Sequence, residues 1–203
     1  MEIQITQDLV QKKSITPNDA GCLQYIEDFL TEKGFVNETL TFGRVKNLWS
    51  VKKNKGPLLV FLGHVDVVPT GPENEWEHDP FSGFDDGTFI NGRGTGDMKG
   101  GIACFMSALS RIDVDNLNYS IGFLITADEE GPSKDGTVKV VEELLQRNEK
   151  IDYCLIGEPS TLETVGDNIR IGRRGSINIE LEVLGKQGHA AYPARVDNPI
   201  HKV

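Results

Sequence analysis

The 203-residue sequence is poor in cysteine, in basic charge and in long apolar runs. Its three cysteines, Cys22, Cys104 and Cys154, are widely spaced and lie within apolar patterns. This setting favours reduced core residues over disulfides or a cysteine-based zinc site. A thiol in apolar surroundings is seldom ionised, so these residues are also poor candidates for a nucleophile.

Basic residues are outnumbered, with 21 lysines and arginines against 31 aspartates and glutamates and a formal net charge of −10. A nucleic-acid partner needs a clustered basic face, which this charge balance argues against. The first residues form neither a basic nor an apolar segment, and runs such as Leu58–Leu62 are far shorter than a membrane span. We therefore expect a cytoplasmic protein that binds neither nucleic acid nor membrane.

Hydrophobic residues make up 38% of the chain and recur with regular spacing, which supports at least one well-packed core. We expect strands at 39–42, 48–51, 57–63, 119–127 and 151–157, and helices at 16–34, 100–112 and 137–148. The strands at 57–63 and 151–157 are apolar enough to be buried on both faces. Alternation of strands and helices predicts an α/β fold with a largely parallel sheet sandwiched by helices.

The pattern changes from Ile169 onward. Alternating apolar residues predict a half-exposed strand that belongs to a different sheet, at Ile177, Ile179, Leu181 and Val183. We therefore expect one domain over 1–168 and the beginning of a second over 169–203. Asn198-Pro199 resembles a helix start, and one strand with one helical turn has no independent stability, so we expect a fragment of a longer chain.

Acidic and imidazole side chains follow the ends of several expected strands or a glycine-rich turn: His64, Asp66, Asp97, Glu129, Glu130 and Glu158. In an open α/β sheet, ligands bind outside the carboxyl ends of the strands, so these side chains can converge in one crevice. One imidazole with several carboxylates suits zinc, cobalt or manganese better than calcium. Two ions are favoured over one, because a single zinc with three ligands would leave carboxylates without a partner.

The spacing within this set suggests different roles. His64 and Asp66 are two residues apart, so in an extended segment Asp66 could accept a hydrogen bond from the imidazole and fix its tautomer. Glu129 and Glu130 are adjacent and point differently, so one could ligate metal while the other acts as a general base. Taken singly, each residue fits a surface position or a helix cap equally well. Their shared position at strand ends favours the metal site.

Four segments resemble the motifs of the family of di-zinc aminoacylases and peptidases that includes acetylornithine deacetylase and succinyl-diaminopimelate desuccinylase. They are residues 62–69 (LGHVDVVP), 92–101 (GRGTGDMKGG), 126–131 (TADEEG) and 157–160 (GEPS). The resemblance runs from about Leu9 to the last residue. It implies these roles: His64 ligates one of two Zn²⁺ ions, Asp97 bridges both, Glu130 and Glu158 each ligate one, Asp66 supports His64, and Glu129 is the general acid/base. Co²⁺ or Mn²⁺ are possible substitutes.

Three more segments resemble the desuccinylase members of this family: 129–137 (EEGPSKDGT), 172–176 (GRRGS) and 187–193 (QGHAAYP). The implied function is removal of succinate from a small-molecule substrate, N-succinyl-LL-2,6-diaminopimelate, in lysine and cell-wall precursor biosynthesis. The family is homodimeric, and His189 would stabilise the oxyanion in the site of the partner subunit. Arg173 or Arg174 could bind a substrate carboxylate through its paired donors.

The sequence departs from the family pattern in one respect. Such enzymes take their last zinc ligand from a histidine near the C-terminus, and none of His64, His78, His189 and His201 fits that role. The resemblance therefore implies an incomplete catalytic domain over 1–168 and the beginning of a lid or dimerisation domain over 169–203, inactive alone.

Other readings stay open at this point. A related deacylase, such as acetylornithine deacetylase, or a metallopeptidase would share the metal site, and a non-catalytic binding or dimerisation module is the alternative from another class. A nucleotide site at Gly92–Gly96 is disfavoured, because Asp97 would repel phosphate and the glycines do not fit the dinucleotide fingerprint.

Overall fold

The structure is a computed structural model that describes residues 1–172, 175, 177 and 179–202. The chain divides into two compact units, Met1–Pro159 and Ser160–Val203. Each unit is described by itself. The expected domain boundary after residue 168 stays a prediction.

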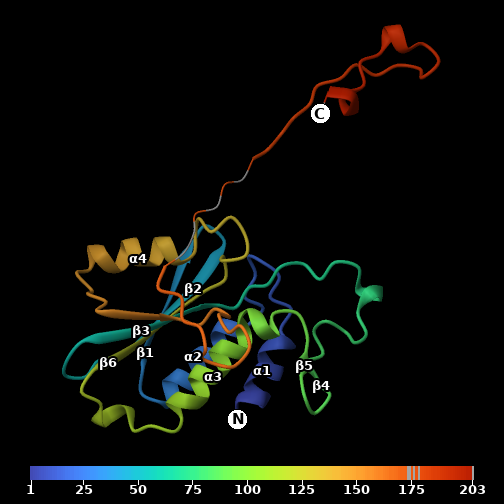
Figure 1. Ribbon diagram of the computed structural model, residues 1–203. Coiled ribbons are helices and arrows are strands. Elements are labelled where there is room, and N and C mark those ends of the chain that lie inside the picture. The colour runs from blue at the N-terminus through green and yellow to red at the C-terminus, as the bar shows by residue number, and fades with distance from the viewer. Residues whose placement is uncertain (173–174, 176, 178, 203) are drawn as a thin grey trace. The chain divides into compact units, whose positions relative to one another are not determined.

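A five-stranded sheet forms the centre of the first unit, in the order β1-β2-β6-β3-β7 (Figure 1). The strands are β1 (Val36–Phe42), β2 (Val45–Lys52), β3 (Leu58–His64), β6 (Ser120–Thr126) and β7 (Tyr153–Ile156). β6, β3 and β7 are parallel, whereas β1 pairs antiparallel with β2, and β2 with β6. The α/β class is confirmed, and the expected parallel pairing holds for the half of the sheet that carries His64.

The connections explain why the sheet is mixed. Only Gly43 and Arg44 separate β1 from β2, and a link this short permits an antiparallel hairpin alone. Longer crossovers, each containing a helix, lead from β3 to β6 and from β6 to β7, as parallel pairing requires. The carboxyl ends of three neighbouring strands therefore lie at one edge of the sheet.

Helices cover both faces of the sheet (Figure 1). α1 (Glu2–Val10), α2 (Cys22–Glu32) and α3 (Gly100–Leu109) lie on one face, and α4 (Thr137–Gln146) lies on the other. Successive strand residues point to opposite faces, so Phe61 and Phe123 join the core under α1–α3, and Val60 and Leu124 join the core under α4. The expected helices at 100–112 and 137–148 are confirmed, each a few residues shorter.

Aromatic rings dominate the larger core. Phe61 stacks on Phe105 of α3 with ring centroids 4.2 Å apart, and the edge of Phe123 meets Phe105 at 5.0 Å. Phe35 completes the group at 5.8 Å from Phe123. Pairs with this geometry contribute beyond the apolar area that they bury. They hold α3 against β3 and β6.

The N-terminal part differs from the expectation in two ways. α1 was not predicted, although Ile5, Leu9 and Val10 have helical spacing and are buried. The second helix was expected to start at Thr16, but α2 begins six residues later, at Cys22. The backbone amide of Thr16 donates to the carbonyl of Val67 at 3.1 Å, and the amide of Asn18 donates to the carbonyl of Ile15 at 3.0 Å, so Thr16 and Pro17 form a turn instead of the first turn of a helix.

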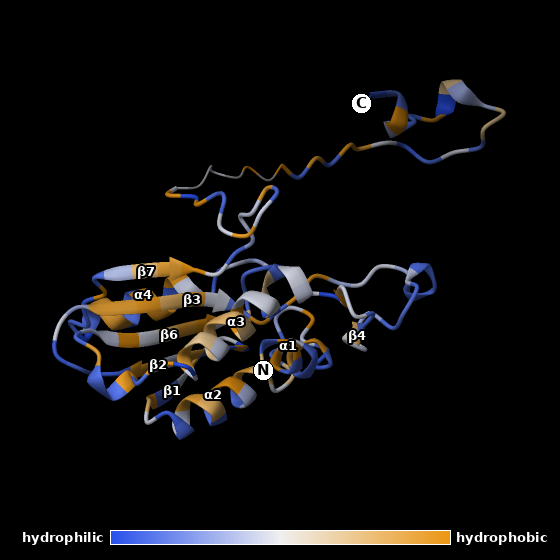
Figure 2. Ribbon diagram, turned by 60° about the horizontal axis from the view of Figure 1, so that its bottom comes forward, coloured by the Kyte–Doolittle hydropathy of each residue, from blue (hydrophilic) through white to orange (hydrophobic). Residues whose placement is uncertain are grey.

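β7 is an edge strand, so the prediction that 151–157 is buried on both faces was wrong. The end of β7 is hydrophobic (orange in Figure 2), yet Leu155 is 50% exposed and Ile156 is 49% exposed. Within the described residues, β7 pairs with β3 on one side only. An apolar run predicts a strand well, but its place in the sheet depends on which segments pair with it.

The cysteines are free, as expected, but only Cys22 is a core residue; Cys104 and Cys154 are exposed. Cys154 is exposed because it lies on the edge strand β7, and Cys104 lies on the outer side of α3. No helix in the described part of the chain has both the length and the apolar character needed to cross a membrane.

The stretch 69–96 contains little regular structure. Its short elements are the 3-10 helix η1 (Glu73–Glu75) and the paired strands β4 (Phe84–Asp85) and β5 (Ile90–Asn91). It leads into the π-type turn η2 (Thr95–Lys99), which carries Asp97 and runs directly into α3. A further 3-10 helix, η3 (Val114–Asn116), precedes β6.

In the second unit, the described residues form two 3-10 helices, η4 (Pro193–Arg195) and η5 (Pro199–Lys202). The expected helix start is confirmed, because the Asn198 side chain accepts a hydrogen bond from the amide of Ile200 at 3.0 Å. The expected strand is not formed by the described residues of 177–183, where Ile177 is 87% exposed. A half-exposed strand needs a partner, and within the described residues none pairs with this segment.

A buried lysine ties α1 to the turn before α3. Lys99 is fully buried, and its ammonium group donates to the carbonyls of Leu9 at 2.9 Å and Lys12 at 3.0 Å. The carbonyls at a helix C-terminus have no partner within the helix and favour a nearby cation. Burial lowers the pKa of Lys99. The hydrogen bonds of Lys99 thus offset the cost of burying its charge and fix the turn.

Replacing Lys99 by methionine should lower the free energy of unfolding by about 2–4 kcal/mol, because the carbonyls of Leu9 and Lys12 would each lose a charged donor. Urea unfolding measures this difference. Lys46→Met is the matched control, since the Lys46 side chain is 59% exposed, and it should change stability by no more than about 0.5 kcal/mol. Equal effects of the two substitutions would contradict the anchoring role.

Candidate metal site

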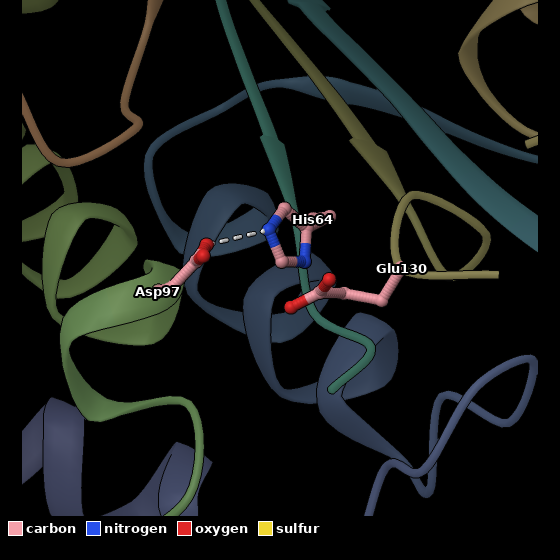
Figure 3. Close-up of side chains that lie close together, drawn as sticks. All are labelled: His64, Asp97 and Glu130. Atoms are coloured by element: carbon pink, nitrogen blue, oxygen red, sulfur yellow. Dashed lines mark hydrogen bonds and ion pairs between the residues drawn. The ribbon is translucent and has the colours of Figure 1, made fainter. Parts of the chain in front are cut away.

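His64 lies at the carboxyl end of β3 and is only 1% exposed. Its Nδ1 lies 2.8 Å from the backbone carbonyl of Asp66, and its Nε2 lies 3.0 Å from Oδ1 of Asp97 (Figure 3). A carbonyl oxygen can only accept, so Nδ1 carries a proton and the lone pair of the neutral ring is on Nε2. Two acceptors then face each other across 3.0 Å. Such an arrangement requires a proton or a metal cation between them.

Other carboxylates surround the same imidazole. Asp97, from the turn before α3, and Glu130, from the loop after β6, approach it from two sides (Figure 3). Potential ligand atoms of His64, Asp97 and Glu130 all lie within 4.8 Å of one another. The same holds for a second set, His64, Glu129 and Glu158. Glu158 follows β7 and places Oε1 3.5 Å from Nε2 of His64.

The electrostatics of this cluster favour a cation. Burial and the neighbouring Glu158 raise the pKa of Asp97, and burial and Asp97 raise the pKa of Glu130. Burial alone would lower the pKa of His64, but hydrogen bonds with Glu158 and Asp66 outweigh it and raise the pKa to about 9. Crowded carboxylates are stabilised in ionised form only when positive charge lies among them.

Asp66 has a different role in the structure from the one expected. Its carboxylate lies 3.6 Å from Nδ1 of His64, beyond hydrogen-bond distance, and the backbone carbonyl of Asp66 orients the ring instead. The buried carboxylate accepts from the amides of Glu129, at 3.2 Å, and Glu130, at 3.1 Å. Asp66 therefore joins β3 to the loop after β6 and holds both glutamates at the site.

A second buried aspartate, Asp128, lies in the loop after β6, and its role was not predicted. The carboxylate of Asp128 accepts from the amides of Ser133, Lys134 and Asp135 at 2.9–3.3 Å. These bonds close the loop that begins with Glu129 and Glu130. The glycine and serine content of 129–137 indicates a turn, but nothing local in the sequence identifies Asp128 as its centre.

Six of the nine sequence-derived site residues come together in the first unit: His64, Asp66, Asp97, Glu129, Glu130 and Glu158. His189 belongs to the second unit and is described only within it. Arg173 and Arg174 lie outside the described residues. The expectation that distant carboxylates meet at the ends of β3, β6 and β7 is confirmed.

The donor set fits a divalent transition-metal ion. A neutral imidazole with several carboxylates is an ordinary ligand set for zinc and suits cobalt or manganese as well, whereas calcium takes oxygen ligands only. The hydrogen bond from Nδ1 to a carbonyl is the usual way to orient a metal-binding histidine. His64 belongs to both potential ligand sets, so the two sets overlap at one imidazole.

Fold and site together define an α/β protein with a histidine–carboxylate cluster at the carboxyl ends of parallel strands, able to hold divalent metal ions. The chain belongs to peptidase family M20/M25/M40, whose sequence model matches residues 60–202. This match covers more than half of the chain and contains all six clustered residues.

Curated relatives are about half identical to this chain over the region that aligns with it. The succinyl-diaminopimelate desuccinylase of Hydrogenovibrio crunogenus is 54% identical over 202 residues, 98% of this chain and 53% of that protein. The enzyme of the same name from Marinobacter nauticus is 51% identical over 203 residues, 99% of this chain and 54% of that protein. The chain thus spans about half the length of these relatives.

Solved structures show the same fold at lower identity. Human carnosine dipeptidase 1 aligns with a TM-score of 0.70 at 20% identity, over 79% of this chain and 38% of that chain. The M20 family metallo-carboxypeptidase Sso-CP2 from Sulfolobus solfataricus aligns with a TM-score of 0.66 at 22% identity, over 78% of this chain and 37% of that chain. These similarities confirm the fold class.

Replacing Asp66 by asparagine should lower the free energy of unfolding by about 2–4 kcal/mol, because a buried amide group would place a donor against the amides of Glu129 and Glu130. Chemical denaturation without added metal measures the loss. Asp28→Asn, at an exposed position of α2, is the control and should stay within about 0.5 kcal/mol of the natural protein. An unchanged stability of Asp66→Asn would show that the carboxylate does not hold the loop.

Proposed function

We propose that this chain forms the metal-binding part of an amide hydrolase that releases succinate from N-succinyl-LL-2,6-diaminopimelate, in the synthesis of lysine and cell-wall precursors. The observation that carries the proposal is the clustering of His64 with four carboxylates in a chain about 50% identical to proteins named for this reaction. The family supplies the hydrolytic chemistry, and the names of the relatives supply the substrate.

We assign two zinc ions to the complete site, with cobalt or manganese as substitutes. His64, Glu130 and Glu158 would each ligate one of the two ions, and Asp97 would bridge both. The potential ligand sets around His64 and the acceptor-to-acceptor approach of His64 and Asp97 support metal binding at this cluster, and the number of ions rests on the family resemblance. When bound, the ions polarise the acyl oxygen of the substrate and lower the pKa of water.

Glu129 is the proposed general acid/base. Its backbone is held by Asp66, and its carboxylate lies within 4.8 Å of ligand atoms of His64 and Glu158. Glu129 would take a proton from the attacking water, whose oxygen bonds to the acyl carbon. The C–N bond then breaks, and Glu129 returns the proton to the amine nitrogen. The products are succinate and the free amine.

Residues of the second unit would complete the site. His189 accepts a hydrogen bond at Nδ1 from the amide of Ala191 at 3.1 Å, so the neutral ring carries its proton on Nε2 and can donate to an oxyanion. We propose that His189 acts in the site of the partner subunit of a homodimer. Arg173 or Arg174 would bind a carboxylate of the substrate.

The proposed organisation follows from these roles. Residues 1–168 would form the metal-binding part of the catalytic domain, and 169–203 would begin a lid or dimerisation domain. We propose a cytoplasmic location together with this function.

A substrate panel tests the proposed reaction. The full-length natural protein, stripped of metal and reloaded with zinc, should hydrolyse succinyl-diaminopimelate at least about ten-fold more efficiently, by kcat/KM, than acetylornithine or dipeptides. Preference for acetylornithine or a dipeptide would reassign the substrate within the family. Absence of hydrolysis together with less than one zinc per chain would favour a non-catalytic binding module.

Glu129→Gln tests the general-base role and separates it from metal ligation. We expect kcat to fall by about 10²–10⁴-fold with unchanged zinc content, because the amide cannot accept the proton of water. Zinc content is measured by atomic emission on the same preparation. Glu130→Gln is the comparison and should lose zinc. A loss of zinc in Glu129→Gln would make Glu129 a ligand, and near-normal turnover would remove it from catalysis.

A further inference from the structure

Met98 lies between the segments that carry the candidate metal ligands. It follows Asp97 directly and is fully buried. Its sulfur accepts a hydrogen bond from the backbone amide of His64 at 3.3 Å. A thioether is a weak acceptor, but here it is the partner of a buried amide at the end of β3, and such groups are costly to leave without one. Met98 thus connects the backbone of His64 to the turn of Asp97.

The terminal methyl of Met98 also fills the space between the ends of β3 and β7. A Cβ atom added at Gly63 or at Gly157 would lie 2.7 Å from Cε of Met98, closer than any ordinary contact. Gly63 immediately precedes His64, and Gly157 immediately precedes Glu158. A Cβ atom at Gly157 would also lie 2.6 Å from Cζ of Phe61, so the two glycines admit the side chains of Met98 and Phe61 next to two candidate ligands.

A third glycine completes this packing. A Cβ atom added at Gly101, in the first turn of α3, would lie 2.6 Å from the carbonyl oxygen of Gly157. The amide of Gly157 in turn donates to the carbonyl of Leu62 at 3.1 Å, which continues the pairing of β3 with β7. The backbone near Glu158 is thus enclosed by β3 on one side and by α3 with its preceding turn on the other.

We propose that Met98 is a positioning residue that sets the distances among His64, Asp97 and Glu158 and thereby sets the metal affinity of the site. The inference rests on the metal site of the proposed function. Protein interiors are close-packed, so the volume of one side chain determines how closely the surrounding backbone segments approach. Residues that orient metal ligands without touching the ion commonly change affinity by about 10–100-fold.

Variants of Met98, made in the full-length protein, test this role. Their zinc affinity and their thermal unfolding are compared with those of the natural protein. Met98→Ala should bind zinc about ten-fold or more weakly in competition with a chromogenic chelator. Met98→Leu keeps most of the volume but lacks the sulfur acceptor and the unbranched end. It should lower the unfolding temperature of the metal-free protein less than Met98→Ala does, because it leaves no large cavity, yet still bind zinc several-fold more weakly.

Met106→Ala is the matched control. Met106 is also fully buried, but it lies six residues into α3, away from the ligand-bearing turn. Its replacement should lower the unfolding temperature of the metal-free protein about as much as Met98→Ala does, because both create a core cavity. It should leave zinc affinity unchanged within about two-fold. Equal zinc affinities of the two alanine variants would overturn the positioning role.

Gly63→Ala provides an independent test that does not remove Met98. The added methyl must displace Cε of Met98, so zinc affinity should fall about five-fold or more. In the Met98→Ala background the same substitution should have a clearly smaller effect, because only the contact with Cε1 of Phe61, at 3.3 Å, would remain. Equal effects in both backgrounds would contradict the inference. Absence of zinc binding by the natural protein would instead remove the proposed metal site, and the inference with it.

Discussion

Mutual repulsion among the carboxylates around His64 is the constraint on which the rest of this structure depends. Asp97, Glu130 and Glu158 approach one buried imidazole, and burial and proximity raise the pKa values of Asp97 and Glu130. The side chains come from separate segments, so the backbone must hold them together against this repulsion. A divalent cation removes the repulsion, which is why the same cluster is costly without metal and well suited to binding it.

Buried hydrogen bonds and close packing supply this restraint. Asp66 accepts from the amides of the two adjacent glutamates, Lys99 ties the turn of Asp97 to the end of α1, and Met98 fills the space beside His64. None of these three residues is an expected metal ligand. Each connects a ligand-bearing segment to another part of the fold, so ligand geometry is determined by groups outside the first coordination sphere.

Sequence reasoning predicted most of this site because its residues follow recognisable strands. His64 and Glu158 come directly after apolar runs, and the parallel arrangement of β3, β6 and β7 brings the ends of such runs to one edge. Sequence reasoning did not predict α1, the late start of α2 or the exposure of β7. The spacing of Ile5 and Leu9 does indicate α1, whereas the start of α2 and the exposure of β7 depend on how distant segments pair, as Thr16 does with Val67.

The sequence by itself determined the α/β class, the strands and helices with strong periodicity, and the residue types that can bind a transition metal. Only the tertiary structure decided which hydrogen bonds and packing contacts form around His64. It gave the orienting hydrogen bond to the backbone carbonyl of Asp66, turned the Asp66 carboxylate to the loop after β6, and placed Met98 against Gly63 and Gly157. The physical reason is that periodicity reports which face of an element is buried, whereas the partner of each buried group depends on how distant segments meet.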